Sequence, residues 1–342
     1  MWYRNTGSDN DVVVSSRVRL ARTLADYPME GKITDEQAKE LIGKIRAVFE
    51  GKEGWQYIDY GSLSVADRAA MTEMHLVSRE FAEKKTPCAL IQNTEASVYI
   101  MVMEEDHLRI QCVLGGSRLK EAMKAAIEAE AIIDEAVELA FSEELGYITR
   151  CPTNLGTGLR ASVMLHLPLL TRSGAMRSLP YQLPKMGLTI RGMEGEGSNP
   201  SACLYQISNE VTLGVSEEET IQRLEEVIAQ LMKKERELRS RLGERTRDEL
   251  TERSLRSLGS LMYASRLSSA EVLGRYSELR LSAAMGWVKL PAELCDELLF
   301  STMTNTVMAA NPNVKTPLER DRARAKTVQN ILGQAEFVKN HA

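Results

Sequence analysis

The chain has few of the residues and sequence features that mark several common protein classes. It contains only five cysteines and four histidines in 342 residues. The cysteines are odd in number and widely scattered, which suits a reducing compartment and offers no closely spaced zinc ligands. The first residues lack the apolar core of a signal peptide, and no apolar run approaches membrane-spanning length. We therefore expect a cytoplasmic protein with no membrane contact and no protein-bound metal site.

Other absences exclude nucleic-acid binding and two catalytic classes. A net charge of −5 offers no basic surplus for direct contact with nucleic acid. No G-x-x-x-x-G-K-[ST] string exists, which excludes a P-loop, and no G-x-S-x-G string exists for a serine hydrolase. Residues 156–161 fit the dinucleotide pattern G-x-G-x-x-A, but they precede a strand-like stretch instead of opening a helix. We reject that match.

The overall composition is that of an ordinary globular protein with two domains. Hydrophobic residues make up 43% of the chain and charged residues 27%. A chain of 342 residues is long enough for a large core and a second domain. The highly charged stretch 233–245 is a plausible boundary, so we expect a catalytic domain over 1–240 and a helical domain over 247–342.

Hydrophobic periodicity predicts the main elements. Thr34 and Ser216 each begin a capping box ahead of a helical pattern, and an alanine-rich helix is expected over 120–142. Residues from about 247 onward are expected to form helices only. Short strands separated by tight turns indicate an antiparallel sheet and an α+β fold with flanking helices. The expected strands are 11–20, 98–103, 108–114, 159–167, 188–191, 204–207 and 211–215.

Five arginines occupy alternate positions of these strand-like segments, beside apolar neighbours. Most arginines lie on protein surfaces, and one such residue would merit that interpretation. Five of them beside loops rich in Gly, Asn, Thr and Glu instead indicate an anion clamp. Guanidinium groups grip phosphate oxygens in bidentate fashion and offset charge as a phosphoryl group moves. The five are Arg17, Arg19, Arg109, Arg160 and Arg191.

Four other residues have both a functional and a structural interpretation. Glu105 and Glu196 could be ordinary turn and loop carboxylates. Beside an arginine cluster, however, a carboxylate can bind a cationic nucleophile and take its proton. Cys151 could be an inert buried thiol, or a thiolate favoured by nearby positive charge. By composition alone, His75 is more often a packed histidine than a ligand.

Three longer strings resemble a known family. They are 15–19 (SSRVR), 104–109 (EEDHLR) and 151–160 (CPTNLGTGLR), and the third is highly specific. They resemble the signatures of the ATP:guanidino phosphotransferases, the creatine and arginine kinase family. Within it, 191–196 (RGMEGE), 204–209 (LYQISN) and 320–325 (RDRARA) are most similar to the bacterial branch that phosphorylates arginine side chains of proteins. The likeness covers nearly the whole chain.

The resemblance implies a role for each matching residue. Glu105 is expected to position and deprotonate the guanidinium, Glu196 to help hold it, and Cys151 to line its site. His75 is expected to lie against the adenine. ATP is expected to contact Ser15, Ser16, Arg17, Val18, Arg19, His75, Arg109, Arg160, Ala161, Ser162, Val163, Met164, Arg191, Gly192, Met193, Glu194, Gly195 and Glu196. An allosteric phosphoarginine pocket is expected at Arg320, Asp321, Arg322, Ala323, Arg324 and Ala325.

The resemblance also implies the reaction and its partners. We expect Mg²⁺ and ATP as cofactors, proteins as substrates through their arginine side chains, and a homodimer. A zinc-binding activator protein, a stress-repressor substrate and a Clp-type protease that degrades marked proteins are expected partners. Two departures stand out: Met103 replaces the usual Asn, and only 1–14 precede the first motif, where phosphagen kinases carry a helical domain. A free-arginine phosphagen kinase and a non-catalytic phosphoarginine-binding adaptor remain the alternatives.

Overall fold

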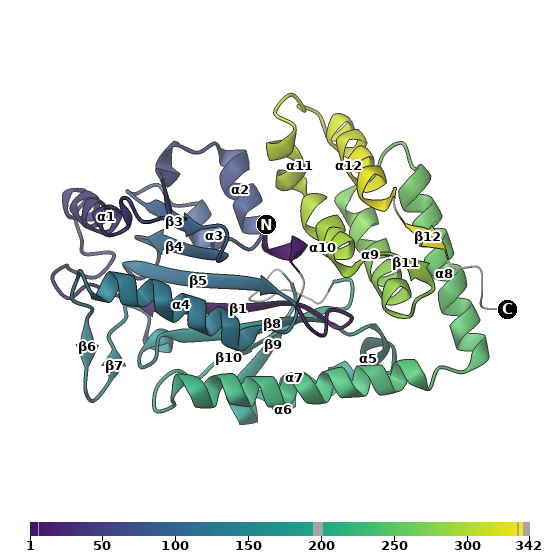
Figure 1. Cartoon of the computed structure of the whole chain (residues 1–342), viewed down its shortest axis with the longest axis horizontal. Coiled ribbons are helices and arrows are strands. Elements are labelled where there is room, and N and C mark those ends of the chain that lie inside the picture. The colour runs from purple at the N-terminus through teal and green to yellow at the C-terminus, as the bar shows by residue number, and fades with distance from the viewer. Residues whose placement is uncertain (6, 194–200, 334, 338–342) are drawn as a thin grey trace.

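An eight-stranded antiparallel sheet forms the centre of the larger part of the molecule (Figure 1). The structure is a computed structural model that describes residues 1–5, 7–193, 201–333 and 335–337. The strand order is β2-β3-β4-β5-β1-β8-β10-β9. The strands are β1 (Val13–Arg22), β2 (Gln56–Ile58), β3 (Ala89–Asn93), β4 (Val98–Val102), β5 (Leu108–Gly115), β8 (Leu159–His166), β9 (Leu188–Arg191) and β10 (Leu204–Asn209).

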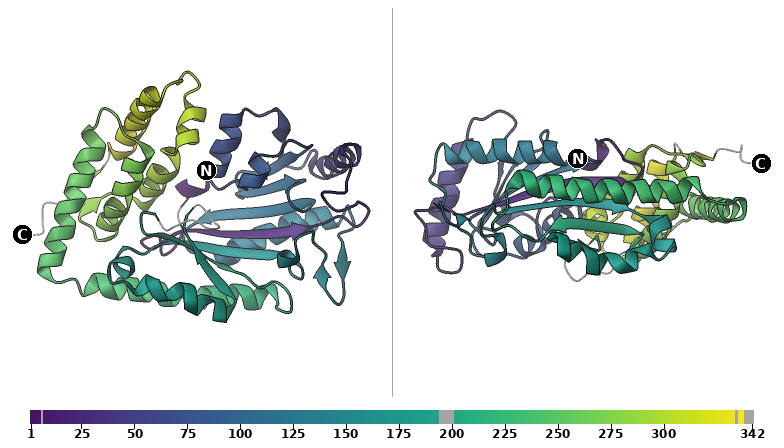
Figure 2. Two further views of the ribbon diagram at one scale, coloured as in Figure 1. Left: turned by 180° about the vertical axis from the view of Figure 1, so that it is seen from behind. Right: turned by 90° about the horizontal axis from the view of Figure 1, so that it is seen from below.

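Two long helices, α4 (Leu119–Asp134) and α7 (Glu217–Ser240), pack against one face of this sheet. The opposite face is seen from behind in Figure 2. Thr34 and Ser216 form the capping boxes predicted from the sequence, and they begin α1 (Asp35–Phe49) and α7. The smaller helical elements are α2 (Val65–Glu73), α3 (Arg79–Ala82), α5 (Pro168–Arg172), α6 (Leu179–Gln182), η1 (Trp2–Arg4), η2 (Tyr60–Ser62), η3 (Pro152–Asn154), η4 (Ala175–Ser178) and η5 (Leu183–Met186).

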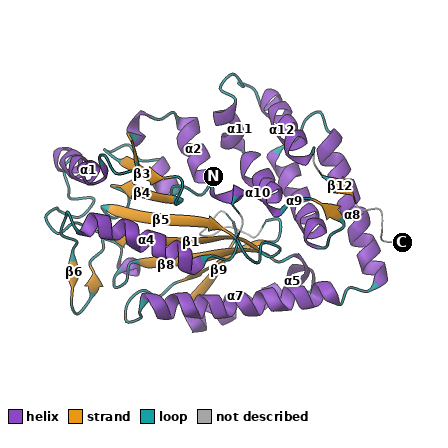
Figure 3. Cartoon of the chain, viewed as in Figure 1, coloured by secondary structure: helices purple, strands orange, loops and turns teal. Residues whose placement is uncertain are grey.

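The C-terminal part is helical, as Figure 3 shows by its purple ribbons. The antiparallel sheet, its flanking helices and this helical region confirm the predicted fold class. The elements are α8 (Glu244–Tyr263), α9 (Ser269–Ala284), α10 (Ala292–Ser301), α11 (Thr304–Ala310) and α12 (Pro317–Leu332), with the two-residue strands β11 (Val288–Lys289) and β12 (Glu336–Phe337).

Three local predictions were wrong. The helix expected over 120–142 ends at Asp134, and the following residues form a hairpin of β6 (Phe141–Ser142) and β7 (Gly146–Tyr147). The strand expected over 211–215 does not form, because the carbonyl and hydroxyl of Thr212 bond to the loop at 153–157. The region after 247 is not helical throughout, since β11 and β12 pair there.

The two parts of the chain meet through an aromatic cluster and a carboxylate. Trp2 and Phe300 pack edge to face with ring centroids 4.7 Å apart, and the Trp2 indole donates to the Met74 carbonyl. The Glu73 carboxylate at the end of α2 accepts four hydrogen bonds, from the backbone amides and side chains of Asn305 and Thr306 at the start of α11. The C-terminal helical region is therefore held against the N-terminal residues and the end of α2.

Across the described ranges, no helix combines the length and the apolar character needed to cross a membrane.

Candidate active site

The strand register brings all five predicted arginines to one face of the sheet. Arg17 and Arg19 of β1 lie opposite Ser162 and Arg160 of β8. On the other side of β1, Arg19 pairs with Gln111, two residues from Arg109 on β5. Because side chains alternate along a strand, these residues lie on one face of the sheet. Gln206 of β10 pairs with β8 on that face, and Arg191 of β9 lies opposite Gln206, so Arg191 is on the same face. The opposite face carries the core packed under α4 and α7.

Positive charge is crowded on this arginine face. Burial, and after it the nearby Arg109, lower the pKa of Arg17 to about 10. Burial also lowers the pKa of Arg19 well below its usual range, aided by Arg17, Arg109 and Arg160. The Arg19 Nε is buried without a hydrogen-bond partner among the described residues. The face is therefore electrostatically prepared for a multivalent anion.

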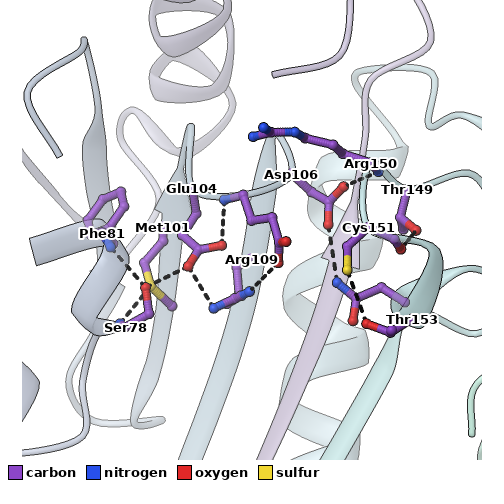
Figure 4. Close-up of polar contacts among 12 residues, drawn as sticks. Ser78, Phe81, Met101, Glu104, Asp106, Arg109, Thr149, Arg150, Cys151 and Thr153 are labelled. Carbon is purple, nitrogen blue, oxygen red and sulfur yellow. Dashed lines mark hydrogen bonds and ion pairs between the residues drawn. The ribbon is translucent and has the colours of Figure 1, made fainter. Parts of the chain in front are cut away.

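An acidic hairpin tip lies at the edge of the arginine face, between β4 and β5 (Figure 4). The Arg109 guanidinium forms ion pairs with both carboxylates of this tip, with N···O distances of 2.6 Å to Glu104 and 3.3 Å to Glu105. The Glu104 side chain is 2% exposed and accepts hydrogen bonds from the Ser78 hydroxyl and the Glu105 amide. The Glu105 side chain is 41% exposed. Glu104 is thus held in place, whereas Glu105 presents a carboxylate to an incoming group.

The Cys151 loop is fixed to the same hairpin (Figure 4). Asp106 accepts the Arg150 amide at 2.6 Å and the Asn154 side-chain amide at 3.4 Å. Burial raises the pKa of Asp106, and these two hydrogen bonds oppose that rise. Cys151 is half-buried, with its Sγ 3.1 Å from the Thr153 hydroxyl. Asp106 therefore holds the loop that carries Cys151 beside the loop that carries Glu105.

His75 lies beside the arginine face at the end of α2. Burial lowers its pKa to about 3, with Arg17 and Arg19 as further causes, so the imidazole is neutral at physiological pH. Its backbone is left-handed (φ 58°), and its carbonyl accepts a hydrogen bond from Gln111. Its ring packs edge-on against Phe300 of α10 at 5.4 Å between centroids. A neutral ring at this position fits contact with an aromatic base.

The remaining predicted ATP contacts fall into several groups. Ser162 shares the arginine face and accepts a hydrogen bond from Arg17 Nε at 3.4 Å, and Met164 shares that face. Ser15 is buried, and the buried Ser16 hydroxyl donates to the Gly116 carbonyl. Two further predicted contacts follow β9: Gly192, which forms a single β-bridge, and Met193, which is buried. The side chains of Val18, Ala161 and Val163 point to the core face, and Glu194, Gly195 and Glu196 lie outside the described residues.

Met103 adopts a left-handed backbone (φ 64°) at the start of the acidic turn. Its amide donates to the His107 carbonyl at 2.7 Å and closes that turn. Asn enters the left-handed region more readily than Met, so the Asn expected here from the family resemblance would suit this backbone conformation. The hairpin nevertheless forms, because the buried Met103 side chain packs into the core.

Sequence reasoning missed two groups that support the acidic hairpin. The Lys84 ammonium donates to the Glu104 carbonyl at 2.8 Å, and Glu30 forms ion pairs with both Lys84 and Arg150. No local pattern marks Glu30 or Lys84, which lie far from the motifs in the sequence. Asn209 is also structural: its side chain bonds to the Ala161 amide and the Leu159 carbonyl and so aligns β8 with β10. It ends one of the strings that carried the resemblance.

The tail motif lies on α12 and is divided between buried and exposed residues. Arg324 is buried and donates to the Thr302 and Leu267 carbonyls and to Asp321. Arg322 is exposed, whereas Arg320 is half-buried with a buried Nε that has no hydrogen bond among the described residues. Ala323 is half-buried and Ala325 is buried.

Family profiles match both parts of the chain. Residues 36–238 match "ATP:guanido phosphotransferase, C-terminal catalytic domain", and residues 247–342 match "Protein-arginine kinase McsB C-terminal domain". The first match alone covers more than half of the chain, and the chain belongs to the ATP:guanido phosphotransferase family.

Relatives that match over nearly the whole chain are protein-arginine kinases. The chain is 38% identical over 334 residues to the protein-arginine kinase of Caldanaerobacter subterraneus, covering 96% of this chain and 99% of that protein. It is 37% identical over 341 residues to the protein-arginine kinase of Brevibacillus brevis, covering 98% and 96% of the two chains.

Solved structures of other guanidino kinases share the fold. The substrate-free duplicated taurocyamine kinase of Schistosoma mansoni aligns with a TM-score of 0.58 and 27% identity, over 67% of this chain and 35% of that one. A lombricine kinase crystal structure aligns with a TM-score of 0.57 and 24% identity, over 69% of each chain. At that identity the second likeness concerns the fold alone.

Proposed function

We propose that this chain is an ATP-dependent protein-arginine kinase that transfers the γ-phosphoryl group to a guanidino nitrogen of arginine side chains in proteins. One observation carries the proposal: a partly exposed carboxylate, Glu105, lies beside a single sheet face that carries five arginines. The arginines suit the polyanionic donor and the carboxylate suits the cationic acceptor. The full-length relatives named protein-arginine kinase support proteins as the acceptor.

The proposed step follows from the charges of the two substrates. A guanidinium is a poor nucleophile because its pKa exceeds about 12. Glu105 would orient the substrate guanidinium and accept its proton as a nitrogen forms a bond to the γ-phosphorus. The bond from that phosphorus to the bridging oxygen would break, and ADP would leave with the electron pair. Arg17, Arg19 and Arg109 would stabilise the charge on the phosphoryl oxygens.

Mg²⁺ belongs to the proposal as an ion carried by the nucleotide. The described residues contain no cluster of three side chains of the types that ligate metals. That arrangement fits Mg²⁺, which commonly takes one or two carboxylates and completes its shell with phosphates and water. When bound, it would neutralise phosphate charge beside the arginine face.

Cys151 and Glu196 complete the proposed guanidinium site. Cys151 is half-buried in the loop that Asp106 fixes beside the hairpin, which supports a role for it in lining the site. The role of Glu196, and the contacts of Glu194 and Gly195 with ATP, rest on the family resemblance. ATP contacts by the remaining predicted residues of β1, β8 and β9 rest on their position in or beside the arginine face.

Phosphorus NMR tests the reaction directly. The protein would be incubated with Mg-ATP and either casein or free arginine. We expect an acid-labile phosphoramidate signal on protein. A signal on free arginine alone would instead establish a phosphagen kinase, and no signal on either would favour the adaptor alternative.

Glu105→Gln tests the assigned base. We expect transfer to be lost while ATP affinity, measured by calorimetry, changes less than about threefold, because Glu105 faces the acceptor. The control is Glu95→Gln, which removes an exposed carboxylate from the turn between β3 and β4. Equal loss of transfer and ATP binding would show that Glu105 supports the nucleotide instead.

We also propose that the tail motif binds phosphoarginine and that the chain divides functionally into 1–240 and 247–342. The buried Arg320 Nε has no hydrogen bond among the described residues and lies 3.9 Å from the Asp321 carboxylate, which supports an anion-binding role there. Asp321→Ala should weaken phosphoarginine binding and alter activation without changing ATP affinity. Because Asp321 also pairs with the buried Arg324, melting temperature must be measured alongside. Unchanged activation in a folded variant would contradict the assignment.

Four further parts of the proposal rest on the family resemblance. They are a homodimer, a zinc-binding activator, a Clp-type protease that recognises the phosphorylated product in stress regulation, and a cytoplasmic location. Light scattering of the purified chain would test the dimer. Adding the activator to the NMR assay would test whether transfer depends on it.

A further inference from the structure

A shallow groove lies between the β6–β7 hairpin and the beginning of α7, apart from the arginine face. Its volume is about 350 Å³. Phe141 and Leu145 of the hairpin and Leu213 before α7 line it, with exposed fractions of 60%, 40% and 48%. Large apolar side chains that gather in an exposed groove mark surfaces that bind other molecules.

The walls of the groove are held by close backbone contacts. Tyr147 of β7 pairs with Gly156, with its amide 2.8 Å from the Gly156 carbonyl, and the Thr157 amide donates to Thr212 at 3.0 Å. A side chain at Gly146 would put its Cβ 2.6 Å from the Gly156 carbonyl, so glycine is required at that contact. The Arg22 guanidinium stacks over the Tyr147 ring at 3.5 Å. The groove is therefore a preformed feature and not a gap between loose loops.

The same backbone leads directly to the proposed acceptor site. The Thr212 hydroxyl lies 3.0 Å from the Thr153 carbonyl and 2.8 Å from the Leu155 carbonyl. These residues belong to the loop that begins at Cys151, and Asn154 of that loop bonds to Asp106, the neighbour of Glu105. The groove and the proposed acceptor site are thus connected through one short, hydrogen-bonded loop.

The charge of the groove selects the chemistry of its occupant. Glu144, Glu217 and Glu219 line it, and among its described lining residues there is no lysine or arginine. Glu143 and Glu218 next to them are exposed. An apolar surface bordered by carboxylates is complementary to a segment that combines apolar and basic side chains.

We propose that this groove docks the protein substrate, as an extended segment with apolar and basic residues near the arginine to be phosphorylated. The inference rests on the proposed function and adds to it a substrate-recognition surface outside the acceptor site. Binding energy from the groove would hold the target arginine at the Cys151 loop without contacting the reacting atoms. The attraction is screened by salt, so docking should weaken as ionic strength rises.

The test uses two fluorescent peptides that share one central arginine. One flanks it with Lys and Leu, and the other with Glu and Ser. Anisotropy binding and transfer kinetics are measured for the full chain, for Glu144→Lys, and for Leu145→Ser combined with Leu213→Ser. These positions are exposed, so the variants should fold. The controls are Glu95→Lys and Tyr263→Ser, which change an exposed carboxylate and an 83% exposed aromatic elsewhere.

We expect the unaltered chain to bind the basic-apolar peptide at least fivefold more tightly than the acidic one. Each groove variant should lose most of that preference through a higher KM, with kcat unchanged. Equal peptide binding by the groove variants and the unaltered chain would overturn the proposal. Groove variants that change the oligomeric state but not the peptide affinity would also overturn it. If no peptide is phosphorylated at all, the proposed function fails, and the anisotropy data alone decide whether the groove binds the peptide.

Discussion

Arg19 of β1 lies directly opposite Arg160 of β8 in the antiparallel register. Like charges that lie directly opposite each other on two neighbouring strands destabilise a sheet. The fold retains this unfavourable pair at the centre of the sheet, between strands that are otherwise well paired. An anion bound over both guanidinium groups would remove the repulsion, which supports the proposal that this face binds an anionic ligand.

Replacement of Arg19 separates its contribution to ligand binding from its contribution to folding. Arg19→Gln should weaken ATP binding about 10–100-fold, because a charge-assisted hydrogen bond is worth about 1.5–3 kcal/mol. The melting temperature without ligand should stay the same or rise, since the repulsion across β1 and β8 is relieved. Calorimetry and thermal denaturation measure the two effects. Arg256→Gln, at an exposed site on α8, is the matched control. A large drop in melting temperature would contradict this account.

Glu104 and Glu105 should differ sharply when each is changed to Gln. Glu104 is buried and accepts hydrogen bonds from Ser78 and the Glu105 amide besides pairing with Arg109, so its loss should cost about 1.5–3 kcal/mol in unfolding free energy. The Glu105 side chain is only 41% exposed and lies farther from Arg109, so its loss should cost less, about 1 kcal/mol or below. Urea denaturation compares the two. Similar stabilities would mean that Glu104 is not the anchor of the hairpin.

Glu30 is predicted to be a positioning residue for the acidic hairpin. It pairs with Lys84, which holds the Glu104 carbonyl, and with Arg150, whose amide is held by Asp106. Glu30→Gln should lower kcat about tenfold without changing ATP affinity, since its two cations would lose their common partner. Glu30→Asp should restore part of the activity. Glu36→Gln on the exposed side of α1 is the control. A purely structural role would lower the melting temperature and leave kcat intact.

Glu73 is predicted to fasten the helical region to α2. Its carboxylate accepts four hydrogen bonds from Asn305 and Thr306. Glu73→Ala should therefore destabilise this contact by about 2 kcal/mol or more. Hydrogen exchange of amides in α11 should accelerate, while exchange in β1 and β5 stays slow. Glu80→Ala, a change at an exposed residue of α3, should have no such effect. Unchanged exchange in α11 would show that the apolar contacts suffice.

His75 should make stability depend on pH in a defined direction. Its pKa falls from 6.5 to about 3 on folding, so the unfolded chain binds its proton first as the pH is lowered. Stability is lost as pH falls below about 6.5, by up to about 1.4 kcal/mol per pH unit, until the folded pKa is reached. Urea melts between pH 7.5 and 5 should show a weaker slope for His75→Gln than for the unaltered chain. Parallel slopes would contradict the shift.

Local patterns predicted much of the fold correctly. The capping boxes at Thr34 and Ser216 involve residues three apart, so no tertiary contact is needed to recognise them. The helix expected over 120–142 was too long, because alanine-rich composition says nothing about the pairing of Tyr147 with Gly156. That pairing draws the chain into the β6–β7 hairpin. Tertiary contacts overrode propensity at this point.

The sequence by itself determined that Arg17 and Arg19 share a face, because side chains alternate along any strand. It did not determine which strands are neighbours or in what register they pair. Only the tertiary structure decided that Arg160 and Arg109 join them, and that Glu30 supports a hairpin distant from it in the chain. The physical reason is the distance along the chain over which each interaction acts. Alternation and capping act over a few residues, whereas register and buried ion pairs depend on segments that meet only when the whole core has formed.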